Sequence, residues 1–214
     1  MLAGDGQPID HAHTEMTDLT RVLIAAVAGY LLGSIPVAVL VGRRHRVDPR
    51  DVGDRNPGYW NAKEQLGRRA ALPVFLGDVA KGAAAAAVGL ALGGPWWIGY
   101  VAVFFAMVGH AWPVFAGFRG GRSILAFVGG MVVLNPLPAL VCVGLLVVVW
   151  GVTRSFAWGA RVAVFGFPAV QLVFDPATHV AATGACMCLI GLRFWQAART
   201  SARARSAPDG LPPA

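Results

Sequence analysis

Charged residues are scarce in this chain of 214 residues. Asp, Glu, Lys and Arg make up 14% of the sequence and hydrophobic residues 56%, whereas about 25% of an ordinary soluble domain is charged. This composition excludes a soluble enzyme and is typical of a membrane protein. Because a bilayer core roughly 30 Å thick takes about 20 apolar residues per helical crossing, the chain can supply about six or seven crossings and no large extramembrane domain.

Cysteine is also rare. Cys142, Cys186 and Cys188 all lie in apolar segments and lack the CxxC or histidine spacing of a zinc site, so we expect reduced packing residues and no metal. The polar N-terminal residues lack the basic start and early apolar stretch of a cleaved signal peptide. The membrane signal is therefore expected in the helices of the mature chain.

The net charge of +7 could indicate a nucleic-acid-binding protein. Such proteins present their cations on a solvated face, however, whereas here the cations stand between apolar runs. The pattern predicts the lipid bilayer as a partner and no nucleic acid.

The positions of the basic residues predict the topology. The apolar run 22–42 ends in Arg43, Arg44 and Arg46, and because basic clusters stay in the cytoplasm, the polar residues 1–21 should be extracytoplasmic. Runs 70–92 and 97–115 then return the chain to a second cytoplasmic loop. We expect cytoplasmic loops at residues 43–69 and 116–123.

The uncharged stretch 123–153 is broken by Asn135, Pro136 and Pro138, which predicts either one kinked crossing or two short ones. Two crossings keep the C-terminal arginines in the cytoplasm, so we favour two, with further crossings at 156–173 and 180–195. The prediction is an all-α, polytopic integral membrane protein. It has about seven transmembrane helices, one or two of them short, in a single membrane domain (22–195), with the N-terminus outside and a disordered cytoplasmic tail (200–214).

Glycines, amides and guanidinium groups gather in the two cytoplasmic loops. The first loop offers Gly53, Asn56, Gly58 and Asn61, and the second offers Arg119, Gly120, Gly121 and Arg122. Such segments suit phosphate binding, because guanidinium groups make bidentate contacts and glycine backbone N–H groups can approach an anion closely. Either loop alone could equally be an ordinary turn with membrane-anchoring arginines.

Asp78, Lys81 and His110 fall within the second and third apolar runs. Asp78 and Lys81 are three apart on one helical face, so they could pair to neutralise each other or point into a wet cavity. His110 ends the third run and could contact a substrate, or it could simply lie at the interface. It is the candidate catalytic residue.

At these positions the chain resembles the bacterial acyl-phosphate:glycerol-3-phosphate acyltransferases, the PlsY family. The motifs that carry the resemblance are GYLLGSIP (29–36), DPRDVG (48–53), Asn56-Pro57-Gly58 with Asn61, DVAKG (78–82), GHAWPVF (109–115) and FRGGR (118–122). They cover roughly residues 29–126 in order and spacing.

The resemblance implies a multi-pass enzyme of the cytoplasmic membrane that uses neither a metal nor a cofactor. It would transfer an acyl group from acyl phosphate to glycerol 3-phosphate, making lysophosphatidic acid for phospholipid synthesis. Arg119 and Arg122 would bind phosphate, Gly120 and Gly121 would allow close backbone approach, and Gly53 and Gly58 would belong to the phosphate-binding loop. The remaining polar lining would come from Ser34, Asn56, Asn61, Lys81 and His110.

Several positions depart from the family pattern. Asp54 and Arg55 replace a serine and a glycine, and Asp54 brings a carboxylate that would repel phosphate. Ser123 stands in place of a glycine, and the C-terminal histidine and asparagine of the family are missing around Arg193. The alternative is therefore a catalytically altered or inactive paralogue that binds lipid or phosphate. A small channel or transporter is a third interpretation.

Overall fold

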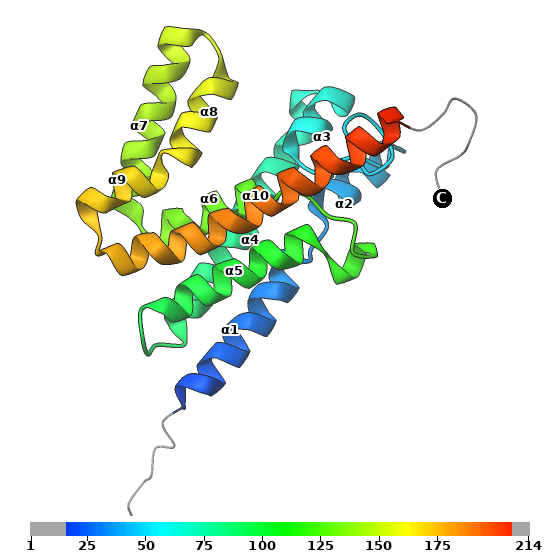
Figure 1. Cartoon of the computed structure of the whole chain (residues 1–214). Helices are drawn as coiled ribbons and strands as arrows, with labels where there is room; N and C mark the ends of the chain where they lie inside the picture. The colour runs from blue at the N-terminus through cyan, green and yellow to red at the C-terminus, as the bar shows by residue number, and fades with distance from the viewer. Residues whose placement is uncertain (1–15, 207–214) are drawn as a thin grey trace, which may run out of the picture.

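The computed structural model describes residues 16–206, which form helices joined by turns, with no β-strand in that range (Figure 1). This confirms the all-α prediction. In chain order the helices are α1 (Asp18–Gly33), α2 (Val37–Arg44), α3 (Tyr59–Leu66), α4 (Arg68–Ala91), α5 (Trp97–Ala111), the short 3-10 helix η1 (Val114–Ala116), α6 (Ile124–Leu134), α7 (Pro136–Thr153), α8 (Phe156–Phe165), α9 (Phe167–Phe174) and α10 (Ala177–Ser206).

Five or six segments of the described chain are apolar and long enough to span a membrane. Five are long enough on their own: Asp18–Arg44, Arg68–Ala91, Trp97–Ala116, Pro136–Thr153 and Ala177–Thr200. The bent pair α8 and α9 is the sixth candidate, and α6 is an apolar helix shorter than these. The segments agree with the sequence analysis, including the short element at 124–134 and the separate helix after Asn135, while seven crossings and the sides of the termini stay predictions.

The two ends of the bundle differ in their chemistry. At one end Arg21 Nε donates to the carbonyl of Leu92 at 3.2 Å, which places the start of α1 beside the α4–α5 turn. At the other end Arg193 of α10 contacts the loop before α6. We call the second end the loop end, because residues 45–58 and 112–123 lie there.

The first apolar run is broken near its middle. Sequence analysis treats 22–42 as continuous, but the helix stops at Gly33 and resumes at Val37, because Pro36 lacks a backbone N–H and disfavours a helical conformation at Ile35. At the break the Ile35 carbonyl accepts hydrogen bonds from the Val37 N–H at 3.0 Å and from Lys81 Nζ at 3.3 Å. A helical defect is therefore satisfied by a charged side chain of α4.

The predicted crossing at 156–173 is also bent, by 46° between α8 and α9. Gly166 lies at the junction, and a proline follows in the first turn of α9. A buried polar cluster holds the bent segment to the bundle. Tyr100 Oη donates to Asn135 Oδ1 at 2.8 Å, and Gln171 Nε2 donates to both the Tyr100 oxygen at 3.1 Å and the Asn135 oxygen at 3.0 Å.

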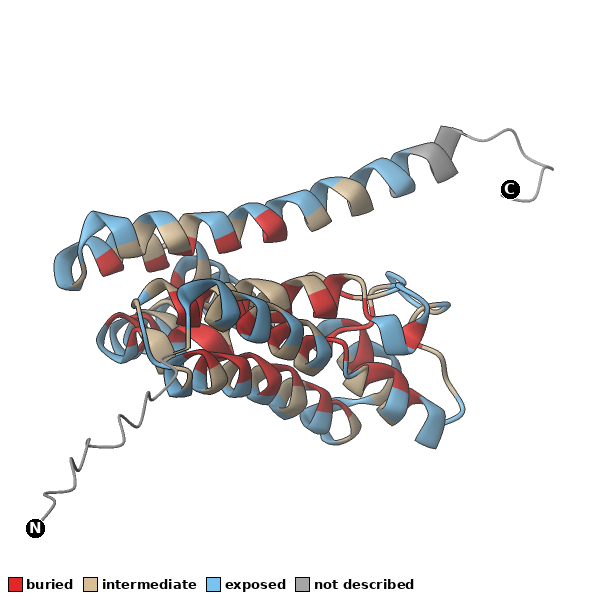
Figure 2. Ribbon diagram, turned by 90° about the horizontal axis from the view of Figure 1, so that it is seen from below, coloured by how far each residue is buried: buried red, intermediate tan, exposed pale blue. Residues whose placement is uncertain are grey.

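Helices α1, α4, α5 and α6 form the centre of the molecule, and α10 lies along one side of it (Figures 1 and 2). The bundle-facing side of α10 carries buried residues, including Cys186 and Ile190. Cys142 is buried as well, whereas Cys188 is exposed. None of the three forms a disulfide.

The last helix is longer than expected. α10 continues to Ser206, so the first part of the segment 200–214, for which disorder was expected, is helical. Residues 207–214 and 1–15 lie outside the described part of the chain, and the start of α1 at Asp18 falls within the expected polar N-terminal segment.

Candidate functional site

The two glycine- and arginine-rich loops meet at the loop end. Arg50 Nη1 donates to the Ala116 carbonyl at 3.0 Å, and Arg119 Nη2 donates to the Arg50 carbonyl at 3.0 Å. The same Arg119 atom pairs with Asp51 at 2.8 Å. Segments more than 60 positions apart in sequence therefore form one surface, as the combined phosphate-site prediction requires.

Beneath this surface lie three buried ionisable side chains. Asp78 Oδ1 is 2.8 Å from Lys81 Nζ and 3.5 Å from His110 Nδ1, and all three side chains are no more than 6% exposed. The sequence left open whether Asp78 and Lys81 pair or line a cavity, and in the structure they do both. The carboxylate neutralises the ammonium group, which a membrane interior requires of a buried charge.

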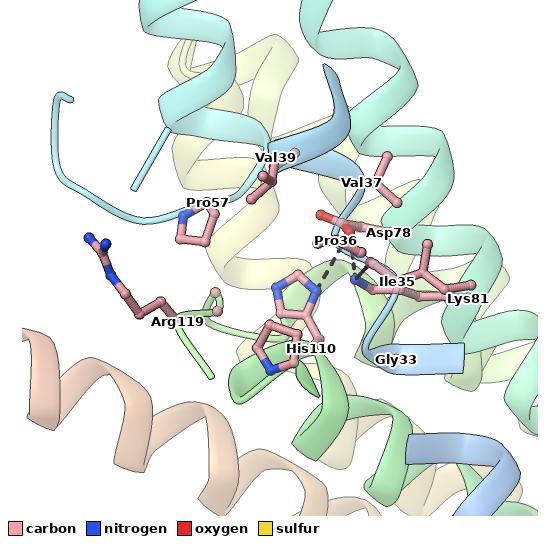
Figure 3. A pocket seen from close by; sticks show the side chains of 14 residues that line it. Gly33, Ile35, Pro36, Val37, Val39, Pro57, Asp78, Lys81, His110 and Arg119 are labelled. Carbon is pink, nitrogen blue, oxygen red and sulfur yellow. Dashed lines mark hydrogen bonds and ion pairs between the residues drawn. The ribbon is translucent and has the colours of Figure 1, made fainter. Parts of the chain in front are cut away.

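These groups line a small cavity of about 20 Å³ (Figure 3). In Figure 3 His110 and Lys81 both point toward Asp78. Pro36 lies next to Asp78, and Pro57 lies toward Arg119. A cavity of this size has room for roughly one water molecule. The lining residues are Gly33, Ile35, Pro36, Val37, Ala38, Val39, Pro57, Asp78, Lys81, His110, Pro113, Arg119, Gly120 and Gly121.

Gly120 and Gly121 pack directly on His110. A Cβ atom at Gly121 would overlap His110 Nε2, and one at Gly120 would overlap the His110 carbonyl. The Gly121 N–H already donates to that carbonyl at 3.0 Å. These glycines thus allow the loop to approach the histidine, and the Gly121 N–H is not free for an anion in this conformation.

Arg193 is a site residue that the sequence analysis did not single out. Its Nε donates to the Gly121 carbonyl at 3.1 Å and its Nη2 to the Gly120 carbonyl at 2.9 Å, and its guanidinium lies 5.0 Å from the centre of the Trp112 ring. An arginine near the end of an apolar run, in a chain with few charges, is the signal that could have indicated it.

The other arginine of the second loop is less exposed than Arg119. Arg122 Nη2 pairs with Asp54 Oδ2 at 3.1 Å, and its guanidinium lies 4.9 Å from the centre of the Phe194 ring. Sequence analysis expects Asp54 to repel phosphate, whereas in the structure its carboxylate is paired with the arginine predicted to bind phosphate.

The first-loop residues serve mainly to shape the loop. Buried Asn61 donates from Nδ2 to the carbonyls of Pro49 at 2.7 Å and Val52 at 3.0 Å, and its Oδ1 lies against Gly53, which has a φ of 60°. This left-handed φ favours glycine. Gly58 is buried and precedes α3, a short helix that the sequence analysis did not expect within 43–69.

The predicted site residues therefore fall into two groups. Lys81, His110 and the second-loop residues other than Arg122 line the cavity, whereas Gly53, Asn56, Gly58 and Asn61 belong to the loop beside it and do not line it. Ser34 lies in the α1–α2 break next to the lining residues Gly33 and Ile35, and it is fully buried. Its hydroxyl has no hydrogen-bond partner among the described residues.

Asp48 and Arg50 fix the start of the first loop. Arg50 Nη2 lies 2.6 Å from Asp48 Oδ2, and Nε contacts both carboxylate oxygens. Hydrogen bonding to the Arg50 side chain lowers the pKa of Asp48 to about 2, and the same contact raises the pKa of Arg50. This segment carries part of the family resemblance, but the pair was not predicted from the sequence.

Ser123 shows how one departure from the family pattern is accommodated. It has a φ of 63°, in the left-handed region where glycine is favoured. Its buried hydroxyl donates to the Met107 carbonyl at 2.7 Å, a contact that glycine could not make. The serine thus adopts a backbone conformation that is less favourable for it than for glycine, and in return its side chain forms a hydrogen bond between the second loop and α5.

Comparison with known proteins gives consistent results. The family model described as glycerol-3-phosphate acyltransferase matches residues 23–204. The "Glycerol-3-phosphate acyltransferase 5" of Dehalococcoides mccartyi is 40% identical over 147 residues, which are 68% of this chain and 63% of that relative's length. A glycerol-3-phosphate acyltransferase of a Synechococcus species is 39% identical over 154 residues, covering 72% of this chain and 76% of the relative.

The fold has a counterpart among solved structures. A crystal structure of PlsY, described as an integral membrane glycerol 3-phosphate acyltransferase in its glycerol 3-phosphate form, superposes with a TM-score of 0.73 at 24% identity. The superposition covers 88% of this chain and 96% of the other. At this identity the likeness concerns the fold.

Proposed function

The chain belongs to the glycerol-3-phosphate acyltransferase family, and from this premise we propose that it transfers an acyl group from acyl phosphate to the 1-hydroxyl of glycerol 3-phosphate. It is a multi-pass protein of the cell membrane. The products are lysophosphatidic acid and inorganic phosphate. One observation carries the proposal: the basic second loop closes over a buried carboxylate, ammonium and imidazole group, all at one end of the bundle.

The chemistry requires positioning more than activation. The hydroxyl oxygen of glycerol 3-phosphate attacks the acyl carbonyl carbon, the bond from that carbon to the phosphate oxygen breaks, and the hydroxyl proton passes to the departing phosphate. Because acyl phosphate is a mixed anhydride and already activated, holding the two substrates in register supplies much of the rate increase. Arg119 and Arg122 hold phosphate charge in this proposal.

Binding requires the loops to move. The cavity of about 20 Å³ has room for roughly one water molecule, and a glycerol phosphate group is several times larger. The contacts between the loops are chiefly those of exposed or half-buried arginines, which exchange partners more easily than buried helices do. We infer that the two loops separate around the substrates while α4 and α5 keep Asp78, Lys81 and His110 in place.

The acyl chain of the donor has a candidate path on the side of the bundle. Between α2 and α4 lies a groove of about 460 Å³ whose lining includes the apolar residues Leu40 and Pro73 and the basic residues Arg44 and Arg69. Arg44 and Arg69 lie one helical turn nearer the loop end than Leu40 and Pro73, which suits an amphiphile with an anionic head. Val37 lines both this groove and the cavity, so the two are adjacent.

His110 is the candidate for a direct role in the reaction. Its Nδ1 faces Asp78 and its Nε2 side faces Gly121, so the imidazole lies between the buried charges and the second loop. In this position it can hydrogen-bond the acceptor hydroxyl and orient it for attack once the loops have moved.

Purified protein in detergent tests the proposed function directly. With acyl phosphate and glycerol 3-phosphate, we expect phosphate and lysophosphatidic acid to appear in equal amounts, above a blank that lacks glycerol 3-phosphate. Arg122→Gln and Gly121→Ala should abolish the transfer. Arg161→Gln, on α8, removes the same charge away from the site and should not change the transfer. Phosphate release no higher than the blank would reject this function for the chain.

A further inference from the structure

Both arginines of the second loop are paired with carboxylates of the first. Arg119 pairs with Asp51 and Arg122 with Asp54. The first pair is open to solvent, with side chains 58% and 62% exposed, whereas those of the second are 27% and 41% exposed. Because water screens exposed pairs strongly, the Arg122–Asp54 pair is the one with the larger effect on anion binding.

The Asp54 carboxylate is held in position from two sides. Its Oδ1 accepts the backbone N–H of Asn56 at 3.0 Å, and its Oδ2 lies 3.1 Å from Arg122 Nη2. Arg122 in turn is held against the Phe194 ring. An anion tethered and oriented in this way loses little entropy on pairing, so it competes with a free anion more effectively than a mobile surface carboxylate would.

We propose that Asp54 is an internal competitor for phosphate at Arg122 and thereby sets the affinity of this chain for glycerol 3-phosphate. The inference rests on the proposed function, which assigns Arg122 to phosphate binding. Substrate binding is then an exchange, in which a phosphate group takes the guanidinium and the Asp54 carboxylate is released to solvent. A phosphate dianion makes this exchange more favourable than a monoanion does, because it brings two charges in place of one.

The exchange predicts which kinetic constant Asp54 controls. The carboxylate has already left Arg122 in the enzyme–substrate complex, so its removal affects the ground state and the transition state equally. Asp54 should therefore raise the KM for glycerol 3-phosphate and leave kcat unchanged. It is a residue that determines affinity, without contacting the reacting atoms.

Asp54→Asn is the informative variant, because asparagine keeps an oxygen for the Asn56 N–H and loses the charge. We expect a KM for glycerol 3-phosphate about 3- to 10-fold lower, with kcat within twofold of the original chain. Asp54→Glu retains the charge and should stay close to the original KM. Glu64→Gln removes one negative charge from an exposed position of α3, so it controls for a general electrostatic effect and should change KM by less than about twofold.

A double variant tests whether the effect passes through Arg122. In an Arg122→Gln background, Asp54→Asn should no longer tighten the binding of glycerol 3-phosphate or of inorganic phosphate, measured by calorimetry on the purified protein. An unchanged or higher KM in Asp54→Asn, with its melting temperature preserved, would overturn the inference. So would an equal decrease in Glu64→Gln, or tighter binding that persists without Arg122.

Calorimetry also separates this inference from the proposed reaction. If no variant transfers acyl groups but Asp54→Asn binds inorganic phosphate several-fold more tightly than the original chain, the competition stands and the reaction is wrong. If transfer proceeds and phosphate affinity is the same in both proteins, the reaction stands and the competition is wrong.

Discussion

Two regions of the molecule are packed in different ways. In the central helices α1, α4, α5 and α6, backbones touch: a Cβ atom at Gly29 or Gly33 would overlap a carbonyl oxygen of α5, and one at Gly82 or Gly129 would overlap a carbonyl oxygen across the α4–α6 contact. In the hairpin of α7, α8 and α9, backbones also approach at Gly159, where a Cβ atom would lie 2.6 Å from the Leu146 carbonyl oxygen, but Gly144 and Gly151 have no atom of another segment within 4 Å of such a position.

The difference corresponds to where the chemistry lies. Within a bilayer, apolar side chains gain little by leaving lipid for protein, so close helix contacts depend on small residues that let backbones approach. The central helices use this device and carry Asp78, Lys81 and His110. The hairpin instead presents large side chains outward, such as Leu140 and Val152, which are 68% and 79% exposed. Close packing thus supports the candidate site, and we expect the exposed side chains of the hairpin to contact lipid.

The largest expected effect is at the buried charge pair of the central helices. Asp78→Asn leaves Lys81 without its carboxylate at a position 5% exposed, which should destabilise the protein by about 3–5 kcal/mol. Thermal unfolding in detergent measures this loss. The double variant with Lys81→Met removes both charges and should recover much of the stability. If Asp78→Asn alone were as stable as the original chain, the site would not depend on charge pairing.

The second prediction compares matched glycines of the two regions. Gly129→Leu forces a side chain into the α4–α6 contact and should cost about 3 kcal/mol, with a reduced yield of monodisperse protein. Gly144→Leu in the hairpin meets open space and should change stability by less than about 0.5 kcal/mol. Equal losses in the two variants would contradict the proposed difference in packing.

The third prediction concerns the contact of α10 with the second loop. Arg193→Ala removes two hydrogen bonds to the glycine carbonyls. It should lower kcat/KM roughly 30-fold, which corresponds to a loss of about 2 kcal/mol in transition-state stabilisation. Arg199→Ala removes the same charge two turns further along, where Arg199 lies over Trp195, and is the control. Activity that falls equally in both variants would indicate a general need for charge on α10.

The smallest effect should come from the first loop. Because the pKa of Asp48 is about 2 when folded, below its ordinary value of 3.8, the paired carboxylate stabilises the loop above about pH 4, and this contribution is lost as the pH falls toward 2. Asp48→Asn should therefore lower stability by less than about 1 kcal/mol at pH 7, and the difference should shrink near pH 3. A stability difference that grows toward acid pH would mean that the charged Asp48 carboxylate does not stabilise the fold.

Much of the fold was predictable because hydrophobic runs and helix breakers act locally. The short helix 124–134, the break at Asn135 and the new helix after it follow from composition and proline. The meeting of the two loops also followed, since both were expected on the same side of the membrane. Local patterns therefore gave the helices and the end of the bundle at which the site lies.

The individual contacts of the site were not predictable in the same way. Nothing in the residues around Arg193 indicates that it bonds the carbonyls of Gly120 and Gly121, more than 70 positions away. Asn61 was expected to face the substrate, but its amide holds the first loop. Partner choice depends on three-dimensional packing, which spacing in one sequence does not encode.

Because the helix is interrupted at Pro36, the number of residues between α1 and α2 determines which side of α2 faces α4. Each residue of an α-helix turns the chain by about 100°. One residue inserted just before Val37 would therefore rotate Arg44 away from the groove beside α4 and move Val37 away from Gly77, against which it packs. The turn at Gly93 and Gly94 contacts Arg21 of α1 and lies at the other end of the bundle from the candidate site. Insertions should therefore disturb the candidate site less in the turn at Gly93 and Gly94 than in residues 34–36 between α1 and α2.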